Sequence, residues 1–245
     1  MNRELKLSVI VPAFNEEQLL PDTLASIRAA ARAFHEAGWS TELIVCDNNS
    51  TDSTASIAAA AGALVVFEPV NQIGRARNAG ASRATGDWLL FVDADSFPTR
   101  ELFADVVRAI RDGRCLAGGS TVYVTDVGAP LRSMLMFWNA WSRALKWAAG
   151  SFIFCEAAAF RSIGGFSEEL YAAEEVDLFR RLKRLARRTG RRIDILHRHP
   201  LLTSGRKAHL YTFREGLLFY LRTIMTGGRT LRSARDAHLW YDGRR

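Results

Sequence analysis

Several features that define common protein classes are scarce in this chain of 245 residues. Only three cysteines are present, Cys46, Cys115 and Cys155, and they lie far apart in apolar surroundings. An odd number without close spacing argues against a disulfide framework and against a zinc knuckle. We therefore expect buried free thiols in a reducing compartment.

Long hydrophobic runs are also missing. The most apolar region, 133–160, is interrupted by Arg143, Lys146 and Glu156, and no uncharged run approaches the roughly 18 residues that span a bilayer. The N-terminal segment MNRELKL lacks the pattern of a signal peptide. We expect a cytoplasmic protein, with peripheral contact at the inner membrane face left open.

Glycine is absent where two large nucleotide-binding classes require it. The first expected strand-to-helix turn reads PAFNEE, residues 12–17, whereas a dinucleotide-binding turn needs glycines so that the backbone can approach a pyrophosphate. A phosphate-binding P-loop is absent as well. A nucleotide would have to be held by carboxylates that read the base and ribose, with its phosphates neutralised by a metal and basic side chains.

What the chain does contain is typical of a globular α/β protein. Hydrophobic residues make up 48% of the sequence and charged residues 24%. The net charge is +7, which favours anionic partners. The basic residues concentrate in the second half, with eight in the segment 180–192.

The first hundred residues alternate between short apolar runs and helical patterns. This alternation predicts βαβ units and a mostly parallel, Rossmann-like sheet flanked by helices. The expected strands are 7–12, 42–47, 63–68 and 87–93, and the expected helices are 21–37, an alanine-rich helix after residue 52, and a short helix within 71–86.

The second half is less regular. We expect strands at 115–124, 192–197 and 200–204, and helices at 173–189 and 207–226 with one or two more in 128–149. The apolar stretch 153–160 is expected to lead into a turn. The prediction is a single domain over 1–245, divided into a nucleotide-binding half at 1–112, an acceptor and catalytic half at 113–205, and a C-terminal helix with a basic tail at 206–245.

Polar clusters follow all four strands of the first half: 15–17, 47–49, 71–78 and 93–95. Open parallel sheets bind ligands outside the carboxyl ends of their strands.

In the last cluster, FVDADSF, residues i and i+2 project to one side, so Asp93 and Asp95 repel each other unless a cation lies near them. Magnesium or manganese would suit these oxygen ligands. Alternatively, Asp95 and Ser96 cap the next helix.

The segments LSVIVPAFNEE, IVCDNNSTDST, NQIGRARNAGASRATGDWLLFVDAD and FRSIGGFSEELYAAEEVDLFRRL follow one another along the chain. In this order they closely resemble family 2 glycosyltransferases of the GT-A type, over roughly residues 7–185. The resemblance implies an inverting transferase that uses a nucleotide-diphosphate sugar and a divalent metal, manganese or magnesium.

The resemblance also implies roles for individual residues. The residues implied to line the nucleotide are Pro12, Phe14, Asn15, Glu16 and Asp47, of which Asp47 reads the base. Those implied to lie near the phosphates and the donor sugar are Gly74, Arg75, Arg77 and Asn78. Asp93 is placed near the ribose and sugar, Asp95 is placed on the metal, and Glu174 and Glu175 form the acidic pair that supplies the catalytic base.

The sequence departs from the family pattern in three places. Asn48 and Asn49 stand where an acidic residue and a glycine are usual, and Glu175 stands where an aspartate is usual. Many members carry a histidine after a late strand as a further metal ligand; here His197 or His199 could match it, and we expect His199. Arg206 and Lys207 then resemble phosphate partners.

The residues by themselves leave some choices open. Acids at the start and bases at the end of 173–189 also suit a helix dipole. The aromatic stretch 135–147 reads as core or a dimer face, or as an acceptor lip or membrane-surface helix. The basic residues of 180–192 read as a solvated face or as a site for anionic lipid.

The expected function is transfer of a sugar from a UDP- or GDP-sugar to a hydroxyl of a glycan, lipid or small molecule. The alternatives are a sugar-1-phosphate nucleotidyltransferase and a non-enzymatic protein that binds anionic surfaces. No nucleic-acid partner is expected, because carboxylates crowd the predicted edge of the sheet. The oligomeric state is left open.

Overall fold

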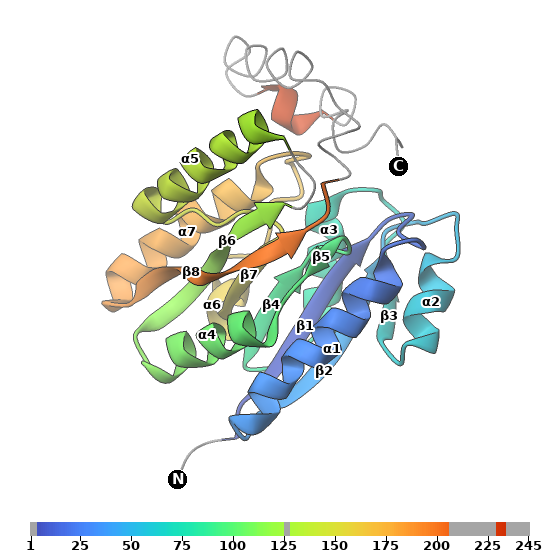
Figure 1. Cartoon of the computed structure of the whole chain (residues 1–245), viewed down its shortest axis with the longest axis horizontal. Helices are drawn as coiled ribbons and strands as arrows, with labels where there is room; N and C mark the ends of the chain where they lie inside the picture. The colour runs from blue at the N-terminus through green and yellow to red at the C-terminus, as the bar shows by residue number, and fades with distance from the viewer. Residues whose placement is uncertain (1–3, 125–127, 206–228, 234–245) are drawn as a thin grey trace.

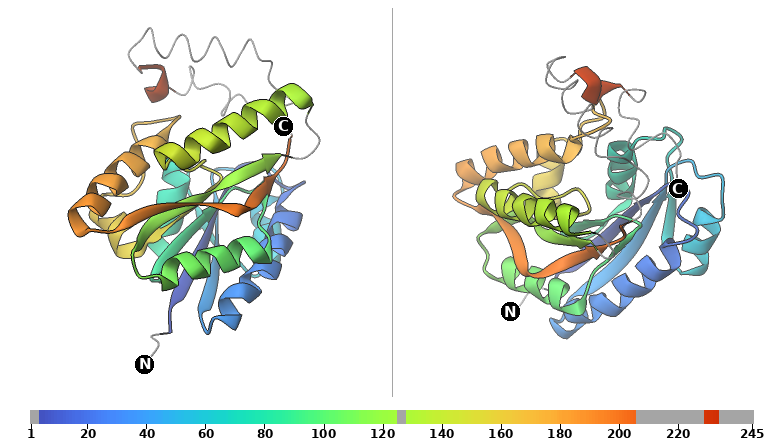
Figure 2. Two further views of the ribbon diagram at one scale, coloured as in Figure 1. Left: turned by 60° about the vertical axis from the view of Figure 1, so that its left-hand side comes forward. Right: turned by 45° about the horizontal axis from the view of Figure 1, so that its top comes forward.

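The computed structural model describes residues 4–124, 128–205 and 229–233. One eight-stranded sheet carries helices on both faces, so the fold has three layers (Figures 1 and 2). Both predicted halves contribute strands to this sheet, in the order β3-β2-β1-β4-β7-β6-β8-β5. The strands are β1 Lys6–Ala13, β2 Ser40–Asp47, β3 Leu64–Phe67, β4 Trp88–Val92, β5 Ser96–Phe97, β6 Cys115–Val124, β7 Phe152–Glu156 and β8 Arg192–Thr203.

The first half of the sheet is parallel, which confirms the prediction. β1 pairs in parallel with β2 and β4, and β2 pairs with β3. Ala13 at the end of β1 lies opposite Asp47 at the end of β2. The loops that follow these strands therefore begin at the same edge.

In the second half the sheet is mixed. β7 runs antiparallel between β4 and β6, and β8 is parallel to β6. The prediction of two short strands at 192–197 and 200–204 is wrong, because β8 is continuous. Its register against β6 shifts between Ser120 and Val122, opposite Leu196 and Leu201. Pro200, which lacks an N–H, lies within that irregular stretch.

The predicted helices of the first half are present, and the stretch 128–149 holds one helix, α5. Three short elements, β5, β7 and α6, were not predicted, because none of them is long enough to show a periodic pattern. The predicted helix at 207–226 lies outside the described residues. The helices are α1 Leu20–Glu36, α2 Thr54–Ala60, α3 Ile73–Arg83, α4 Arg100–Arg111, α5 Ala129–Leu145, α6 Ala157–Ser162 and α7 Glu174–Thr189, with a 3₁₀ turn at Arg229–Arg232.

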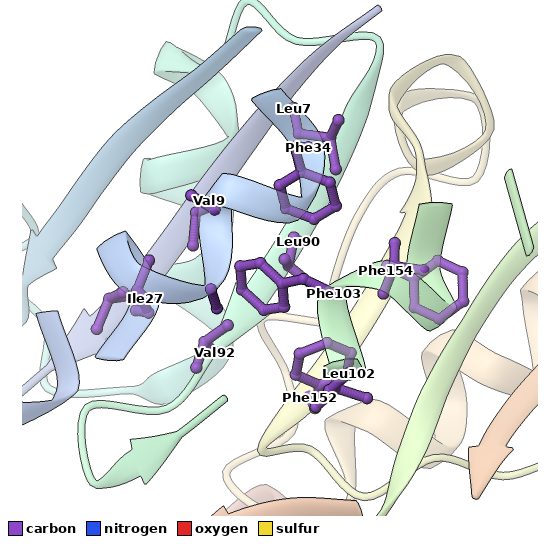
Figure 3. Close-up of a cluster of buried hydrophobic side chains, with 14 of the residues drawn as sticks. Leu7, Val9, Ile27, Phe34, Leu90, Val92, Leu102, Phe103, Phe152 and Phe154 are labelled. Atoms are coloured by element: carbon purple, nitrogen blue, oxygen red, sulfur yellow. The ribbon is translucent and has the colours of Figure 1, made fainter. Parts of the chain in front are cut away.

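Each face of the sheet has its own apolar core. Val9 and Val11 of β1 face α1 and α4, in the cluster that also holds Phe34 and Phe103 (Figure 3). Ile10 lies between them in the sequence and packs on the opposite face with α3, α6 and α7. A strand buried on both sides reads as a continuous apolar run, which is why β1 and β4 were recognisable from sequence.

The three cysteines are free and buried, as predicted. Burial raises the pKa of the Cys46 thiol to about 12, so it stays protonated at neutral pH. Within 4–124, 128–205 and 229–233, no helix is both long and apolar enough to cross a bilayer.

Candidate active site

The loops after β1 and β2 form one side of the candidate site, and they are joined by hydrogen bonds. The backbone N–H of Asn15 donates to Ser50 Oγ at 3.0 Å, and the N–H of Thr51 donates to Asn15 Oδ1 at 2.8 Å. The N–H of Glu16 donates to Thr54 Oγ1 at 2.8 Å. We call residues 14–17 and 47–54 together the loop pair.

Asp47 lies at the floor of the loop pair. Its side chain is buried and accepts a hydrogen bond from the N–H of Ser50, at 3.1 Å from Oδ1. Beside it, Pro12 is buried in β1 opposite Cys46, while Phe14 is half-buried at the start of the loop. The predicted nucleotide-lining residues of β1 and β2 therefore lie next to one another.

Non-glycine residues with positive φ flank this edge and the start of α7. They are Asn15 at 51°, Asn49 at 66° and Ala173 at 60°. Such residues are uncommon, and strained backbone concentrates at functional sites. Asn49 stands where the family pattern has glycine, and asparagine is among the few other residues that tolerate this conformation. The unusual asparagine therefore preserves the turn.

Asn48, the other departure from the pattern, anchors the segment that leads into α3. Its Nδ2 donates to the carbonyls of Glu68 and Val70, and its Oδ1 accepts from the N–H of Gln72 at 2.9 Å. Gln72 in turn donates to the carbonyls of Glu168 and Leu170. Sequence reasoning gave neither side chain a role, because their partners are backbone atoms distant in sequence.

Asp93 and Asp95 lie in the turn after β4. The N–H of Ser96 donates to the carbonyl of Asp93 at 3.1 Å. Asp95 is buried. The alternative that Asp95 caps the next helix is wrong, because Thr99 caps α4 by accepting from the N–H of Leu102. The paired aspartates thus need another explanation.

Arg77 of α3 connects this turn to α7. The arginine is 1% exposed. Its Nη2 donates to Asp93 Oδ1 at 2.9 Å and to the carbonyl of Gly150 at 2.9 Å, and its Nη1 donates to Glu174 Oε1 at 2.7 Å. The guanidinium also lies 5.2 Å from the ring centre of Phe166. We call Arg77, Asp93, Glu174 and Glu175 the arginine hub.

The arginine hub holds three carboxyl groups around one cation. Burial raises the pKa of Glu174, repulsion from Glu175 adds to this, and Arg77 opposes it. Burial likewise raises the pKa of Glu175. The pKa of Arg77 is raised, because the charges of Asp93, Glu174 and Glu175 outweigh the effect of burial. The hub therefore binds protons more tightly than isolated glutamates do.

Glu174 and Glu175 differ in what holds them. Glu174 is buried in its ion pair with Arg77, whereas Glu175 is only partly buried. A Cβ added to Gly150 would lie 3.3 Å from Arg77 Nη2 and 3.7 Å from Glu175 Cδ. Gly150 was not predicted, and it allows its loop to approach the hub this closely.

Three residues that are expected near the phosphates also contact other parts of the protein. Asn78 exchanges hydrogen bonds with the backbone of Phe166, at 3.0 and 2.9 Å. Arg75 pairs with Glu168 at 3.0 Å. A Cβ on Gly74 would lie 3.2 Å from the carbonyl of Ser167. All three position the turn at 166–168.

The structure does not bring His199 into a metal site with Asp93 and Asp95. Its Nδ1 lies 3.0 Å from Oδ2 of Asp105 on α4. The physical reason is that β8 directs this side chain toward α4. In the described part of the chain, no three histidine, cysteine, aspartate or glutamate residues are grouped as metal ligands. Arg206 and Lys207 lie outside the described residues.

The chain is similar to known proteins of one family. Residues 8–165, more than half of the chain, match the family model of Glycosyl transferase family 2. An uncharacterized glycosyltransferase of Mycobacterium tuberculosis is 44% identical over 89 residues, which are 36% of this chain and 36% of that protein.

Two solved structures share the fold. One is residues 1–349 of Staphylococcus aureus TarS in complex with UDP-GlcNAc, 22% identical with a TM-score of 0.62, covering 96% of this chain and 69% of that one. The other is a mannosyltransferase of Pyrobaculum calidifontis in complex with GDP-Man and Mn²⁺, 22% identical with a TM-score of 0.62, covering 82% and 57%. The predicted GT-A fold is therefore confirmed.

Proposed function

The chain belongs to glycosyl transferase family 2, and we propose that it transfers a sugar from a nucleotide-diphosphate sugar to a hydroxyl acceptor with inversion. The observation that carries the proposal is the arginine hub. Through Arg77, Asp93 at the end of β4 is tied to Glu174 at the start of α7. Glu175, the next residue, is thereby held at the edge of the sheet that also carries Asp47 and Asp95.

Asp47 is the residue that reads the base. Its carboxylate can accept a hydrogen bond from a ring N–H, which both uracil and guanine offer. The two structural neighbours bind different donors, UDP-GlcNAc and GDP-Man. The fold is thus compatible with either base, and the proposed donor is a UDP- or GDP-sugar.

Asp95 is the proposed protein ligand of a divalent cation. Magnesium and similar ions commonly bind through one or two carboxylates together with substrate phosphates. This donor set fits, because Asp95 is a buried carboxylate at the edge and Asp93 is already paired with Arg77. A bound cation would offset the charge that develops on the leaving diphosphate.

Glu175 is the proposed general base. It takes the proton of the acceptor hydroxyl while the acceptor oxygen forms a bond to the anomeric carbon. The bond from that carbon to the diphosphate breaks, its electron pair leaves with the diphosphate, and the configuration inverts. A raised pKa suits a base that works near neutral pH. Glu174 and Arg77 position Glu175 and do not exchange protons with substrate.

Two measurements test the proposal. Calorimetry with UDP and with GDP, each with and without Mn²⁺, should show binding of one nucleotide that strengthens with metal. Asp47→Asn should weaken this binding, and the exposed Asp22→Asn on α1 is the matched control. Absence of metal-dependent binding for both nucleotides would falsify the proposed donor class.

The base is tested by donor hydrolysis across several nucleotide sugars. Glu175→Gln should keep nucleotide binding and lower the hydrolysis rate by about 10²–10⁴-fold. An unchanged rate would remove Glu175 from the mechanism without affecting the assignment of Asp47. Asp177→Asn, two residues along α7 and in an ion pair with Arg181, is the control.

A further inference from the structure

Helix α5 exposes a continuous apolar face. Met134, Phe137, Trp138, Trp141 and Leu145 follow the spacing of one helical face. All five side chains are exposed, with Phe137 at 69% and Trp141 at 48%. The rings of Phe137 and Trp141 stack with their centres 6.1 Å apart. We call these five residues the α5 stripe.

The side of α5 that faces the sheet is polar instead. Asn139 exchanges two hydrogen bonds with the backbone of Val122 on β6, at 3.0 and 2.8 Å. Ser142 is buried and donates to the carbonyl of Trp147. Polar side chains therefore help to anchor the helix, while a large part of its exposed surface is apolar. The expectation that the aromatic stretch belongs to the core is wrong for these residues.

Helix α7 lies on the same side of the sheet as α5 (Figure 1). Arg180, Arg184, Arg187 and Arg188 are exposed. Across the described part of the chain, none of the four has an ion-pair partner, whereas the neighbouring Arg181 pairs with Asp177. We call the four the α7 arginines.

Contacts at the end of α5 join the two surfaces. Lys183 of α7 donates to the carbonyl of Leu145, and its Nζ lies 4.8 Å from the ring centre of Trp147. Burial, together with the charges of Arg187 and Lys146, lowers the pKa of Lys183. The segment 129–147 contains no acidic residue. Positive charge is therefore concentrated where the end of α5 meets α7.

We propose that the α5 stripe and the α7 arginines dock the protein on the surface of an anionic lipid bilayer. Aromatic and aliphatic side chains enter the interface, and arginines pair with anionic headgroups. A second copy fits less well, because a symmetric contact would place the α7 arginines against one another. A polyanion would match the arginines and leave the stripe in water.

The docking surface adjoins the candidate active site. After α5 the chain passes through Lys146, and the carbonyl of Gly150 then accepts a hydrogen bond from Arg77 Nη2 of the hub. Docking therefore brings the hub close to the bilayer and favours an acceptor presented at the membrane. The docking itself does not depend on the proposed transfer reaction, and its test measures binding alone.

The test is co-sedimentation of the full chain with vesicles of phosphatidylcholine, with and without phosphatidylglycerol. The protein should sediment only with the anionic vesicles, and added salt should release it. Replacing Arg184, Arg187 and Arg188 together by glutamine should weaken binding to the anionic vesicles on the order of a hundredfold, because each arginine contributes about fivefold. The matched control replaces Arg28, Arg32 and Arg83, exposed arginines of α1 and α3, and removes the same charge.

The stripe is tested separately. Phe137→Ser with Trp141→Ser should weaken binding about tenfold or more, because both side chains lose burial in the interface. Phe67→Ser, at an equally exposed position on the edge strand β3, should change nothing. Both variants alter exposed side chains, and unfolding by urea verifies that they fold.

Four outcomes overturn the proposal. The first is no binding to anionic vesicles, and the second is equal weakening by the control arginine variant. The third is that the protein does not bind vesicles but self-associates in sedimentation velocity, and that the stripe variant abolishes this self-association. The partner of the α5 stripe would then be a second copy of the chain. The fourth is that, in the monomer without vesicles, tryptophan fluorescence is protected from quenching by acrylamide and the stripe variant loses this protection. Another part of this chain would then cover the stripe.

Discussion

The arginine hub and the loop pair lie at the same edge of the sheet but are held together differently. In the hub, one buried cation contacts carboxylates from β4 and α7, and its partner Glu174 is 97 residues away. In the loop pair, backbone N–H groups donate to side-chain oxygens of the two loops. The hub depends on charges that come from three parts of the fold, whereas the loop pair depends on separate hydrogen bonds between two loops.

The difference teaches how each region tolerates change. Removing one partner of a buried ion pair leaves the other charge uncompensated, which costs about 3–5 kcal/mol. Losing one exposed or half-buried hydrogen bond costs about 0.5–1.5 kcal/mol. We therefore expect the hub to act as a unit, and the bonds of the loop pair to contribute nearly independently.

The largest expected effect is that of Arg77→Met. The free energy of unfolding at neutral pH should fall by about 3–5 kcal/mol, because the Asp93 carboxylate loses its buried cation and Glu174 loses its hydrogen-bond donor. Urea denaturation measures the change. The control is Arg75→Met, on the same helix as Arg77. This change breaks a more exposed ion pair with Glu168 and should lower the free energy of unfolding by at most about 1 kcal/mol. Equal losses for the two variants would show that the hub is not interdependent.

The pH dependence of the hub comes next in size. Because burial raises the pKa of Glu174 from 4.5 to about 8, the folded chain binds more protons than the unfolded chain between these values. Stability from this group is present below pH 4.5 and is lost as the pH rises toward 8. The measured quantity is the difference in unfolding free energy between the native chain and Glu174→Gln. As the pH rises across this window, this difference should fall by at least about 1.4 kcal/mol. A flat difference would contradict the assignment.

The smallest expected effect belongs to the loop pair, and its dependence on pH has the opposite sign to that of Glu174. Asp52 accepts from the N–H groups of Thr54 and Glu17, at 2.9 and 3.1 Å. Burial acts to raise its pKa, but these hydrogen bonds outweigh it and lower the pKa. Asp52→Ala should cost about 1 kcal/mol at neutral pH.

The cost of Asp52→Ala should shrink in acid, because stability from a lowered pKa is present above the ordinary aspartate value and lost as the pH falls below it. Urea titrations at several pH values measure this. Asp22→Asn, on the exposed surface of α1, is the control. A cost that grows in acid would place Asp52 with the hub instead.

Much of the fold could be predicted because its signals are local. Strands β1 and β4 are unbroken apolar runs, and α1 begins next to Pro21 and ends just before Gly38. The two-residue strand β5 could not be predicted, since its pairing with Leu202 and Thr203 on β8 is a contact across the fold. The continuity of β8 through Pro200 has the same origin.

For the site, the sequence motifs identified the residues but not their partners. Arg77 and Asn78 are adjacent in the sequence and were expected to act alike. The structure gives them different tasks, because one side chain is directed into the hub and the other toward the backbone of Phe166. Gly150 was overlooked and Asn48 was given no role of its own, since each contacts distant atoms that no local pattern reveals.

The sequence by itself determined the mostly parallel first half of the sheet, the family and the edge at which the polar residues gather, because hydrophobic periodicity and strand ends are properties of neighbouring residues. Tertiary structure decided which charges meet. Arg77 compensates Asp93 and Glu174 only after α3, β4 and α7 have packed, and the α5 stripe is exposed only because Asn139 and Ser142 fix the helix by its polar side. Burial and distance set the strength of an electrostatic contact, and both arise only in the folded chain.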